Sequence, residues 1–220
     1  MNPNPFDFSG KCVLVTGSGR GIGRGIASSF AAAGAAVGLH YRSNRAETEA
    51  MAEEIRRGGG RAAALGADLA LPEEVEGLVA RAEEDLGGLD ILINNAGEYP
   101  VAPLLELPPA DWRRVVEANL TSAFLVTQAA ARGMQRRGSG GVIVNIASIE
   151  AQFSAFGHSH YDAAKAGMVA LTRSSALELA PYGIRVNTVS PGLIGRKGLE
   201  QDWPQGVESW LKLAPLARLG

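Results

Sequence analysis

The sequence has little cysteine, since Cys12 is the one such residue among 220. No disulfide can therefore form within one chain, which is typical of proteins from a reducing compartment. Cys12 stands beside the apolar residues Val13, Leu14 and Val15, and this setting favours a buried thiol that packs as a small hydrophobic group. The first ten residues lack a basic segment followed by an apolar one, so we predict no signal peptide and a cytoplasmic protein.

Long apolar runs and an excess of charge of one sign are also absent. No window approaches the roughly 18 uninterrupted apolar residues of a membrane-spanning helix. The 21 basic and 23 acidic residues are mixed along the chain, which excludes the basic footprint of a nucleic-acid-binding protein. We therefore expect neither a membrane nor a nucleic acid as partner. The composition, 46% hydrophobic and 20% charged, and the length suit one globular domain spanning residues 1–220.

Short β-type runs alternate with longer helical patterns along most of the chain. The predicted strands are Cys12–Thr16, Ala36–Tyr41, Ala62–Ala67, Ile91–Asn94, Val142–Ala147 and Arg185–Ser190. The predicted helices lie near 22–33, 45–57, 72–86, 111–137 and 161–181. Strand–helix alternation with right-handed crossovers predicts an α/β fold: a doubly wound, Rossmann-type parallel sheet with helices on both faces, in a single domain.

The end of the chain departs from this alternation. After Pro191-Gly192 the sequence predicts an irregular stretch that contains Trp203 and Trp210, and no strand pattern follows before Gly220. Either the fold has six strands or this sequence lacks a C-terminal piece. A sheet that ended with its sixth strand would leave an apolar edge unpaired, which proteins rarely tolerate. We therefore expect the native protein to extend beyond Gly220.

A glycine-rich segment, TGSGRGIG at 16–23, directly follows the first predicted strand. Such a turn between strand and helix brings the backbone close to a pyrophosphate and points the helix N-terminus at it. The spacing differs from the G-x-G-x-x-G dinucleotide fingerprint. A glycine-rich turn without a ligand is the alternative, but the position between a strand and a helix favours a nucleotide site.

The end of the second predicted strand indicates which nucleotide binds. An NAD site places Asp or Glu there for the ribose hydroxyls, whereas this chain has His40-Tyr41-Arg42-Ser43-Asn44 and no acid before Glu47. Arg42 and Arg20 could converge on a 2′-phosphate, for which a guanidinium is well suited. Both could equally be solvated surface arginines. Two arginines here, with the acid missing, favour NADP(H) over NAD(H).

Two further strand ends carry candidate cofactor contacts. Asp68 follows the third strand and could accept a hydrogen bond from an adenine amino group; a turn or helix-cap role is the alternative. The segment 94–97, Asn-Asn-Ala-Gly, ends the fourth strand at the carboxyl edge, where ligands of open α/β sheets bind. A plain turn is the alternative there.

Tyr161 and Lys165 stand four residues apart in a predicted helix and so share one helical face. The lysine ammonium favours a phenolate, so we expect it to lower the Tyr161 pKa from about 10 toward neutral pH. Ser148 follows the strand at 142–147, and it can reach the same pocket as Tyr161. The two hydroxyls would donate to a carbonyl oxygen on which charge builds as hydride arrives.

Together these motifs resemble the short-chain dehydrogenase/reductase family, especially bacterial NADP-linked members such as 3-oxoacyl-carrier-protein reductases. The resemblance runs from about residue 9 to the end and rests on TGSGRGIG at 16–23, NNAG at 94–97, Asn119, Ser148, YDAAK at 161–165 and SPG at 190–192. It implies a catalytic tetrad of Asn119, Ser148, Tyr161 and Lys165, with no metal. The Asn119 amide could hold a water that links Lys165 to solvent, whereas local capping is the alternative for Asn119 and Ser148.

The resemblance also implies a set of cofactor contacts, in which Lys165 holds the nicotinamide ribose. The predicted cofactor-binding residues are Gly17, Ser18, Arg20, Gly21, Ile22, Gly23, Tyr41, Arg42, Ser43, Asp68, Leu69, Asn95, Ala96, Gly97, Tyr161, Lys165, Pro191, Gly192 and Ile194. In this family the stretch that corresponds to 193–213 is a mobile substrate cover. Gly195-Arg196 stands where a threonine often follows the Pro-Gly segment, which puts the contacts of that cover with the cofactor in doubt.

Several residues flank the predicted pocket. His158 and His160 precede Tyr161, and we expect them to line the pocket or lie at the surface, because no cysteine or carboxylate at metal-ligand spacing accompanies them. The other residues that flank the pocket are Glu98, Glu150, Gln152 and Phe153.

The leading hypothesis is an NADP(H)-dependent oxidoreductase that acts on a ketone or secondary alcohol. A 3-oxoacyl thioester reductase is the first candidate, and a sugar or polyol dehydrogenase is the second. A cofactor-binding sensor or scaffold without catalysis would be expected to lose Tyr161 or Lys165, and both are present. The resemblance further implies a homo-oligomer, a tetramer or dimer, with helices 111–137 and 161–181 at one interface; these helices could equally pack only on their own sheet.

Overall fold

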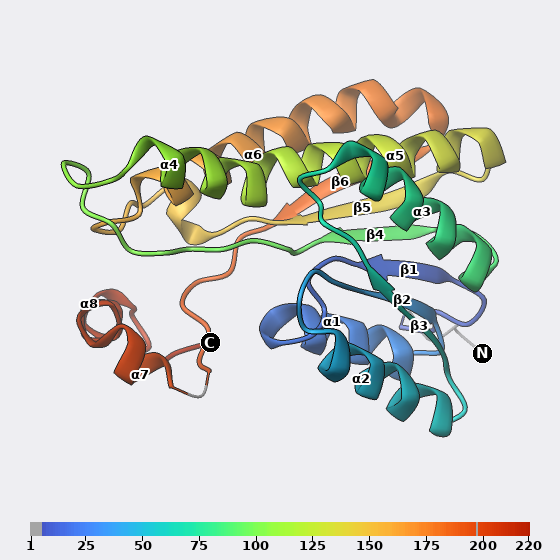
Figure 1. The fold of residues 1–220 in the computed structure, drawn as a ribbon, viewed down its shortest axis with the longest axis horizontal. Coiled ribbons are helices and arrows are strands. Elements are labelled where there is room, and N and C mark those ends of the chain that lie inside the picture. The colour runs from blue at the N-terminus through green and yellow to red at the C-terminus, as the bar shows by residue number, and fades with distance from the viewer. Residues whose placement is uncertain (1–5, 197) are drawn as a thin grey trace.

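Six parallel strands form the centre of the molecule in the computed structural model, which describes residues 6–196 and 198–220 (Figure 1). The strands are β1 (Cys12–Val15), β2 (Ala36–Tyr41), β3 (Arg61–Gly66), β4 (Ile91–Asn94), β5 (Gly141–Ile146) and β6 (Ile184–Val189). Their order in the sheet is β3-β2-β1-β4-β5-β6. β1 pairs on one side with β2 and on the other with β4, so that Val15 stands opposite both Leu39 and Ile93. The doubly wound parallel sheet predicted from the sequence is thereby confirmed.

Helices cover both faces of this sheet (Figure 1). One face carries α1 (Gly21–Ala32) and α2 (Arg45–Arg57), and the other carries α3 (Pro72–Leu86), α5 (Ser122–Arg137) and α6 (Ser159–Leu179). The strand side chains alternate between two cores: Val13 and Val15 pack with Ala27 and Met51 of the first layer, whereas Leu14 packs with helices of the second. Each fully buried aliphatic side chain stabilises the fold by about 1.5–3 kcal/mol relative to an exposed one. Cys12 is buried at 7% exposure, as predicted.

The predicted helix at 111–137 is a composite. α4 (Pro109–Val116) leads into a π-helical turn, η1 (Glu117–Thr121), and then into α5. The apolar periodicity of residues 111–137 does not reveal this turn, because one helical pattern runs through it and through both flanking helices. π-helical turns within longer helices are frequent at functional sites, and this one contains Asn119.

The C-terminal segment, predicted to be irregular, contains two helices. They are α7 (Leu199–Asp202) and α8 (Pro204–Leu213), which lie beyond the carboxyl ends of the strands (Figure 1, red). Two one-turn 3₁₀ segments, η2 (Ile149–Ala151) and η3 (Ala180–Tyr182), flank α6. No helix in the part of the chain that the structure describes is long and apolar enough to cross a bilayer.

Candidate functional site

The candidate site lies at the carboxyl edge of the sheet, where the strand order changes direction. β2 and β3 lie on one side of β1, and β4 lies on the other. Ligands of doubly wound sheets bind in the crevice at such a switch point. The predicted cofactor segments follow β1, β2, β3 and β4 at this edge, and Ser148 follows β5. Tyr161 and Lys165 come from α6, which packs on β6 and β5.

The glycine-rich turn between β1 and α1 is packed too closely for a side chain at Gly17, Gly19 or Gly23. A Cβ on Gly23 would collide with the Gly17 carbonyl and with Nδ2 of Asn95. Asn95 holds the turn in place, because its Nδ2 donates to the carbonyls of Thr16 (2.9 Å) and Gly17 (3.1 Å). α1 then begins at Gly21, and the first N–H groups of a helix have no partners within it. The turn and helix therefore fit the pyrophosphate of a dinucleotide.

His40 connects this turn to the end of β3, a role that the sequence analysis missed. Its Nδ1 accepts from the Gly17 N–H at 3.0 Å, and its Nε2 lies 3.1 Å from the Ala67 carbonyl. Its own carbonyl accepts from the Ser18 N–H at 3.0 Å. Burial lowers the pKa of His40 to about 4, so the ring is neutral and can accept at Nδ1 while it donates from Nε2. A polar residue inside the apolar strand Ala36–Tyr41 was the available signal.

The two arginines predicted to select the phosphate are both exposed and lie near the same turn. Arg20 is the residue before α1, and Arg42 follows β2 beside Ser43. Gly19 packs on the start of α2, where a Cβ would lie 2.8 Å from Oγ1 of Thr48. Their contact with a 2′-phosphate stays a prediction.

Asp68 makes the contacts of a turn residue. Its Oδ1 accepts from the Ala70 N–H at 3.0 Å, and its own N–H donates to Oε2 of Glu74 at 2.7 Å. The neighbouring Leu69 is buried. The turn alternative thus describes the present contacts of Asp68, and its contact with adenine stays a prediction.

The π-helical turn presents the Asn119 amide to the segment 94–97. Nδ2 of Asn119 donates to the carbonyls of Glu98 (2.7 Å) and Val115 (2.9 Å). Its Oδ1 is buried and has no hydrogen-bond partner among the described residues. A Cβ on Gly97 would collide with this oxygen and would lie 3.8 Å from Nζ of Lys165. The side-chain oxygen of Asn119 and the Lys165 ammonium therefore both lie beside Gly97.

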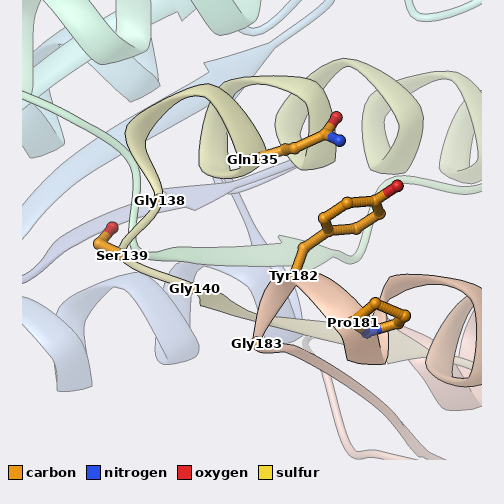
Figure 2. Close-up of a pocket in the computed structure, with 7 residues that line it drawn as sticks. All are labelled: Gln135, Gly138, Ser139, Gly140, Pro181, Tyr182 and Gly183. Atoms are coloured by element: carbon orange, nitrogen blue, oxygen red, sulfur yellow. The ribbon is translucent and has the colours of Figure 1, made fainter.

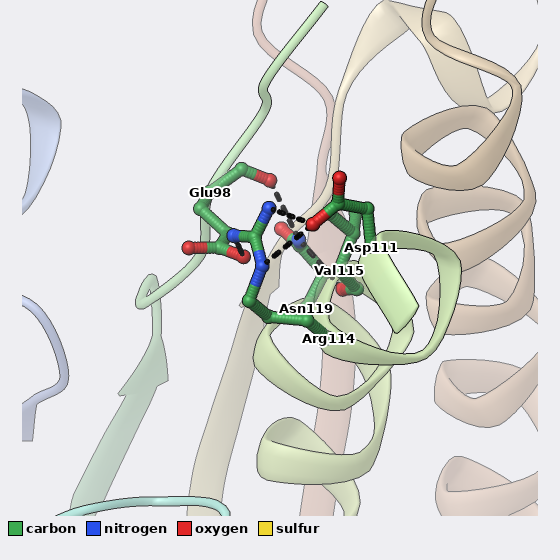
Figure 3. A network of polar contacts seen from close by, with 5 residues as sticks. All are labelled: Glu98, Asp111, Arg114, Val115 and Asn119. Carbon is green, nitrogen blue, oxygen red and sulfur yellow. Dashed lines mark hydrogen bonds and ion pairs between the residues drawn. The ribbon is translucent and has the colours of Figure 1, made fainter. Parts of the chain in front are cut away.

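Arg114 anchors the loop after β4 to α4 (Figure 3). Its guanidinium pairs with Glu98 in that loop and with Asp111 in α4 at 3.0 Å. The Glu98 carbonyl is the one that accepts from Asn119, so this network borders the predicted tetrad. The role of Arg114 could not be predicted from the sequence. The sequence shows its (i, i+3) spacing from Asp111, but its contact with Glu98 exists only in the folded chain.

Ser148, Tyr161 and Lys165 lie together. Ser148 precedes η2, and its side chain lies close enough to Tyr161 to lower the pKa of the phenol by hydrogen bonding. Lys165 is 3% exposed; its Nζ donates to the Ile146 carbonyl at 2.8 Å and lies 5.5 Å from the centroid of the Tyr161 ring. The structure thus brings the three residues and Asn119 to one place, and their catalytic roles stay predictions.

The pKa of Tyr161 is raised to about 12, whereas the Tyr–Lys spacing predicted a lowered value. Burial is the largest cause; the hydrogen bond from Ser148 acts in the opposite direction, and the charge of Glu150 raises the pKa further. Burial also lowers the pKa of Lys165 to about 8, so the ammonium loses its proton more easily than an exposed lysine does. Desolvation of the hydroxyl therefore outweighs the attraction on which that prediction relied.

Both histidines before Tyr161 are buried, so a surface position is wrong for them. His158 is 1% exposed and lies between two rings, with centroids 5.8 Å from that of Tyr161 and 5.1 Å from that of Trp203. Its Nδ1 lies 2.8 Å from Oε2 of Glu150. His160 is fully buried, and burial lowers its pKa. Gln152 and Phe153, which also flank the pocket, are exposed.

The C-terminal segment contacts the surroundings of Tyr161. The Pro191 carbonyl accepts from the Ile149 N–H at 2.9 Å, and the Trp210 ring lies against Gly192. Arg196 pairs with Asp202 at 2.7 Å and hydrogen bonds to Tyr99, whose ring centroid is 6.0 Å from that of Tyr161. Ile194 is partly exposed at 38%. This placement fits the predicted cover, whose mobility stays a prediction.

A separate surface depression of about 550 Å³ lies at the opposite edge of the sheet (Figure 2). It is lined by Gln135, Gly138, Ser139, Gly140, Pro181, Tyr182 and Gly183, at the amino ends of β5 and β6. This lining contains no carboxylate, imidazole or cationic group, and none of the predicted site residues. The depression is therefore not the reaction site.

Comparisons with known proteins agree with this arrangement. Residues 11–205 match the family model described as short chain dehydrogenase. The chain is 41% identical to an L-rhamnose 1-dehydrogenase (NAD(P)(+)) from Azotobacter vinelandii, over 96% of this chain and 84% of the relative. It is 37% identical to a 3-oxoacyl-[acyl-carrier-protein] reductase from Synechocystis, over 94% of this chain and 82% of the relative.

Solved structures give the same result. A dehydrogenase/reductase from Sinorhizobium meliloti superposes with a TM-score of 0.91 at 37% identity, over 98% of this chain and 84% of that chain. A short-chain type dehydrogenase/reductase from Mycobacterium marinum superposes with a TM-score of 0.89 at 38% identity, over the same shares of each chain.

Proposed function

The chain belongs to the short-chain dehydrogenase family and is an oxidoreductase of alcohol and carbonyl groups; from this premise, we propose that it transfers hydride between NADP(H) and a ketone or secondary alcohol. The observation that carries the proposal is the placement of Ser148 next to Tyr161, beside the buried Lys165 whose Nζ lies 5.5 Å from the centroid of the Tyr161 ring. When bound, the nicotinamide supplies or accepts the hydride. The turn at 16–23, Asn95 and Gly97 would hold it, since the turn brings backbone N–H groups and the start of α1 to the edge of the sheet where dinucleotides bind.

Tyr161 is the proton donor in the proposed reduction. Its raised pKa keeps the hydroxyl protonated at neutral pH, so the proton that a general acid donates is in place before hydride transfer. The Ser148 and Tyr161 hydroxyls would donate to the substrate oxygen and stabilise the negative charge that develops on it. The Lys165 ammonium would favour the phenolate once the proton has left. In the oxidation of an alcohol, the phenolate of Tyr161 would take the proton back.

For the cofactor we propose NADP(H) over NAD(H). Support comes from the exposed guanidinium groups of Arg20 and Arg42 and from the missing acid at the end of β2. Titration with both reduced cofactors tests this: NADPH should bind more tightly, and the gap should shrink at high salt because exposed ion pairs are screened. Arg42→Asp should reverse the preference. Tighter binding of NADH by the native protein would refute it.

A 3-oxoacyl thioester is the first substrate class we propose. The loops that flank Tyr161 expose several apolar side chains, which would suit an acyl chain: Val101, Leu104, Leu105, Phe153 and Phe156. These loops adjoin, because the Ala102 N–H donates to the Gly157 carbonyl at 2.8 Å. A sugar is the second class, favoured by the 41% identity to a protein named as an L-rhamnose dehydrogenase.

The test follows NADPH absorbance with a panel of 3-oxoacyl thioesters and simple ketones, and NADP⁺ reduction with aldoses and polyols. Tyr161→Phe keeps the ring and removes the proton donor. Its turnover should therefore fall by about 10²–10⁴-fold while NADPH still binds. Near-normal turnover of this variant on a confirmed substrate would show that the mechanism is wrong. Cofactor binding with no turnover of any substrate by the native protein would favour the sensor or scaffold.

We further propose that the protein acts in the cytoplasm as a homo-oligomer. The support for the compartment is the single, buried, free cysteine. The support for association is the exposure of Phe124 on α5 and Leu177 on α6, at 42% and 78%.

A further inference from the structure

Glu150 connects the two arms of the loop that joins Ser148 to Tyr161. On the first arm, its backbone N–H donates to Oγ of Ser148 at 3.1 Å. On the second arm, its Oε2 lies 2.8 Å from Nδ1 of His158, the residue that precedes α6. Burial and the nearby Glu150 carboxyl raise the pKa of Asp162, which lies in the first turn of α6. One residue thus contacts both Ser148 and the histidine that caps the helix of Tyr161.

The contact between Glu150 and His158 is buried, so the two side chains have little freedom to move. The His158 side chain is 2% exposed and that of Glu150 is 16% exposed. The imidazole contacts the rings of Tyr161 and Trp203, and the His158 backbone carbonyl accepts from the Asp162 N–H at 2.8 Å. A hydrogen bond to a charged group is stronger than one between neutral groups, so the carboxylate is able to fix the imidazole and, through the His158 backbone, the first turn of α6.

From these contacts we infer that Glu150 is a positioning residue for proton transfer: through His158 it holds the Tyr161 hydroxyl against that of Ser148. The inference deepens the proposed function and rests on it. Glu150 itself does not touch the reacting atoms. Its carboxylate is engaged with His158, which distinguishes it from a group that binds substrate.

Charge gives the positioning a second, measurable consequence. Several titratable or charged groups lie around Tyr161. They are Glu150 on η2, His158 just before α6, Asp162 and Lys165 on α6, Tyr99 in the loop after β4, and Arg196, which bonds to Tyr99. Glu150 is the charged group with the largest effect and raises the Tyr161 pKa. Glu150→Gln retains a carbonyl oxygen that can accept from His158 but removes the charge. In this variant the phenolate should form at lower pH.

The experiment compares Glu150→Leu and Glu150→Gln with a matched control, Glu84→Leu and Glu84→Gln, which removes an exposed carboxylate on α3. Turnover at saturating cofactor and substrate should fall between about ten- and a hundredfold in Glu150→Leu, because a small misplacement of reacting groups has costs of this order. Glu150→Gln should recover most of that loss. NADPH affinity should stay within about twofold in both, since no predicted cofactor contact is touched.

The pH profile of alcohol oxidation separates positioning from a merely structural role. In Glu150→Gln the profile should shift to lower pH, whereas a general loss of stability would lower the melting temperature and leave the profile in place. Turnover of Glu150→Leu within about twofold of native, or an unshifted profile in Glu150→Gln, would overturn the inference while leaving the proposed function intact. A native protein that turns over no ketone or alcohol would overturn the proposed function and this inference together.

Discussion

At Tyr161, burial and charge act in opposite directions on one hydroxyl. Burial raises its pKa to about 12, and the nearby Lys165 holds its own proton weakly, with a pKa of about 8. The hydroxyl is therefore prepared to donate a proton, which suits reduction of a carbonyl. Oxidation of an alcohol needs the phenolate, which is the minor form at neutral pH.

The two directions should consequently differ in their dependence on pH. Because the Tyr161 pKa is raised, the phenolate fraction grows about tenfold per pH unit below it. Turnover in oxidation should then rise steeply between about pH 6 and 8, a range below the Lys165 pKa, while turnover in reduction changes little. Initial rates at saturating cofactor and substrate check this. A pH-independent oxidation would contradict it.

His40 illustrates a polar residue whose function lies in its two buried hydrogen bonds. Its ring joins the N–H of Gly17 to the carbonyl of Ala67. We expect His40→Phe to leave both backbone groups unpaired and to destabilise the fold by about 1–3 kcal/mol. The glycine-rich turn should also lose its position, so that NADPH binds more weakly. Thermal unfolding and cofactor titration measure the two effects, and unchanged affinity would show that the turn is held without His40.

The depressed pKa of His40 adds a prediction about acid. The folded pKa of about 4 lies below the ordinary value of 6.5, so between these values the unfolded chain binds a proton that the folded chain does not. Stability from this group is thus fully present above about pH 6.5 and is lost as pH falls toward 4. Native protein should lose more stability over that range than His40→Phe. Urea unfolding at several pH values checks this, and parallel curves would contradict it.

At the scale of elements, the sequence predicted the strands and most helices to within one residue. Hydrophobic periodicity and glycine or proline punctuation are local signals, and they place β2, β4, α2 and α3 as observed. The π-helical turn at Asn119 was missed because it depends on contacts made only in the fold, such as the bond from Asn119 to the Glu98 carbonyl. α7 and α8 were missed because both are short and rich in turn residues.

In the candidate site, too, the residues with a local sequence pattern could be predicted and those defined by contacts in the fold could not. Motif residues such as Ser148, Tyr161 and Asn119 carry a recognisable pattern, and the fold places them together. The partners that hold them do not: Glu150 and His158 are eight residues apart, and Arg114 and Glu98 are sixteen apart, with no shared periodicity. The direction of the Tyr161 pKa shift could not be predicted either, because it depends on burial.

The contact between the NNAG segment and the π-helical turn gives a test at this scale. Gly97→Ala would press a Cβ against Oδ1 of Asn119, so the Asn119 side chain must shift. Turnover should fall about tenfold or more, since the Asn119 and Lys165 groups lose their alignment. Gly25→Ala is the matched control, because a Cβ there meets open space on α1. It should keep activity and raise stability by about 0.4–1 kcal/mol. Equal activity of the two variants would contradict the assigned contact.

For the whole molecule, the two faces of the sheet differ. Burial along β6 alternates: Ile184 and Val186 are buried, whereas Arg185 and Asn187 are exposed. The described helices therefore cover β6 on the face of α6 and leave its other face open. On the covered side, α5 and α6 bury their inner faces against the sheet and still present apolar side chains outward, including Phe124 and Leu177. Such outward apolar side chains are typical of an association surface.

We expect the protein to associate through α5 and α6, so its mass in sedimentation should be a multiple of the 22.9 kDa chain. In the double variant Phe124→Glu/Leu177→Glu, association would remove two unpaired carboxylates from water, which is unfavourable. The variant should therefore be a monomer. Both side chains are exposed within one chain, so the folded monomer should remain. Leu71→Glu is the control, because Leu71 is similarly exposed, at 41%, but lies before α3. A monomeric native protein, or a double variant that associates as the native protein does, would contradict an interface on these two helices.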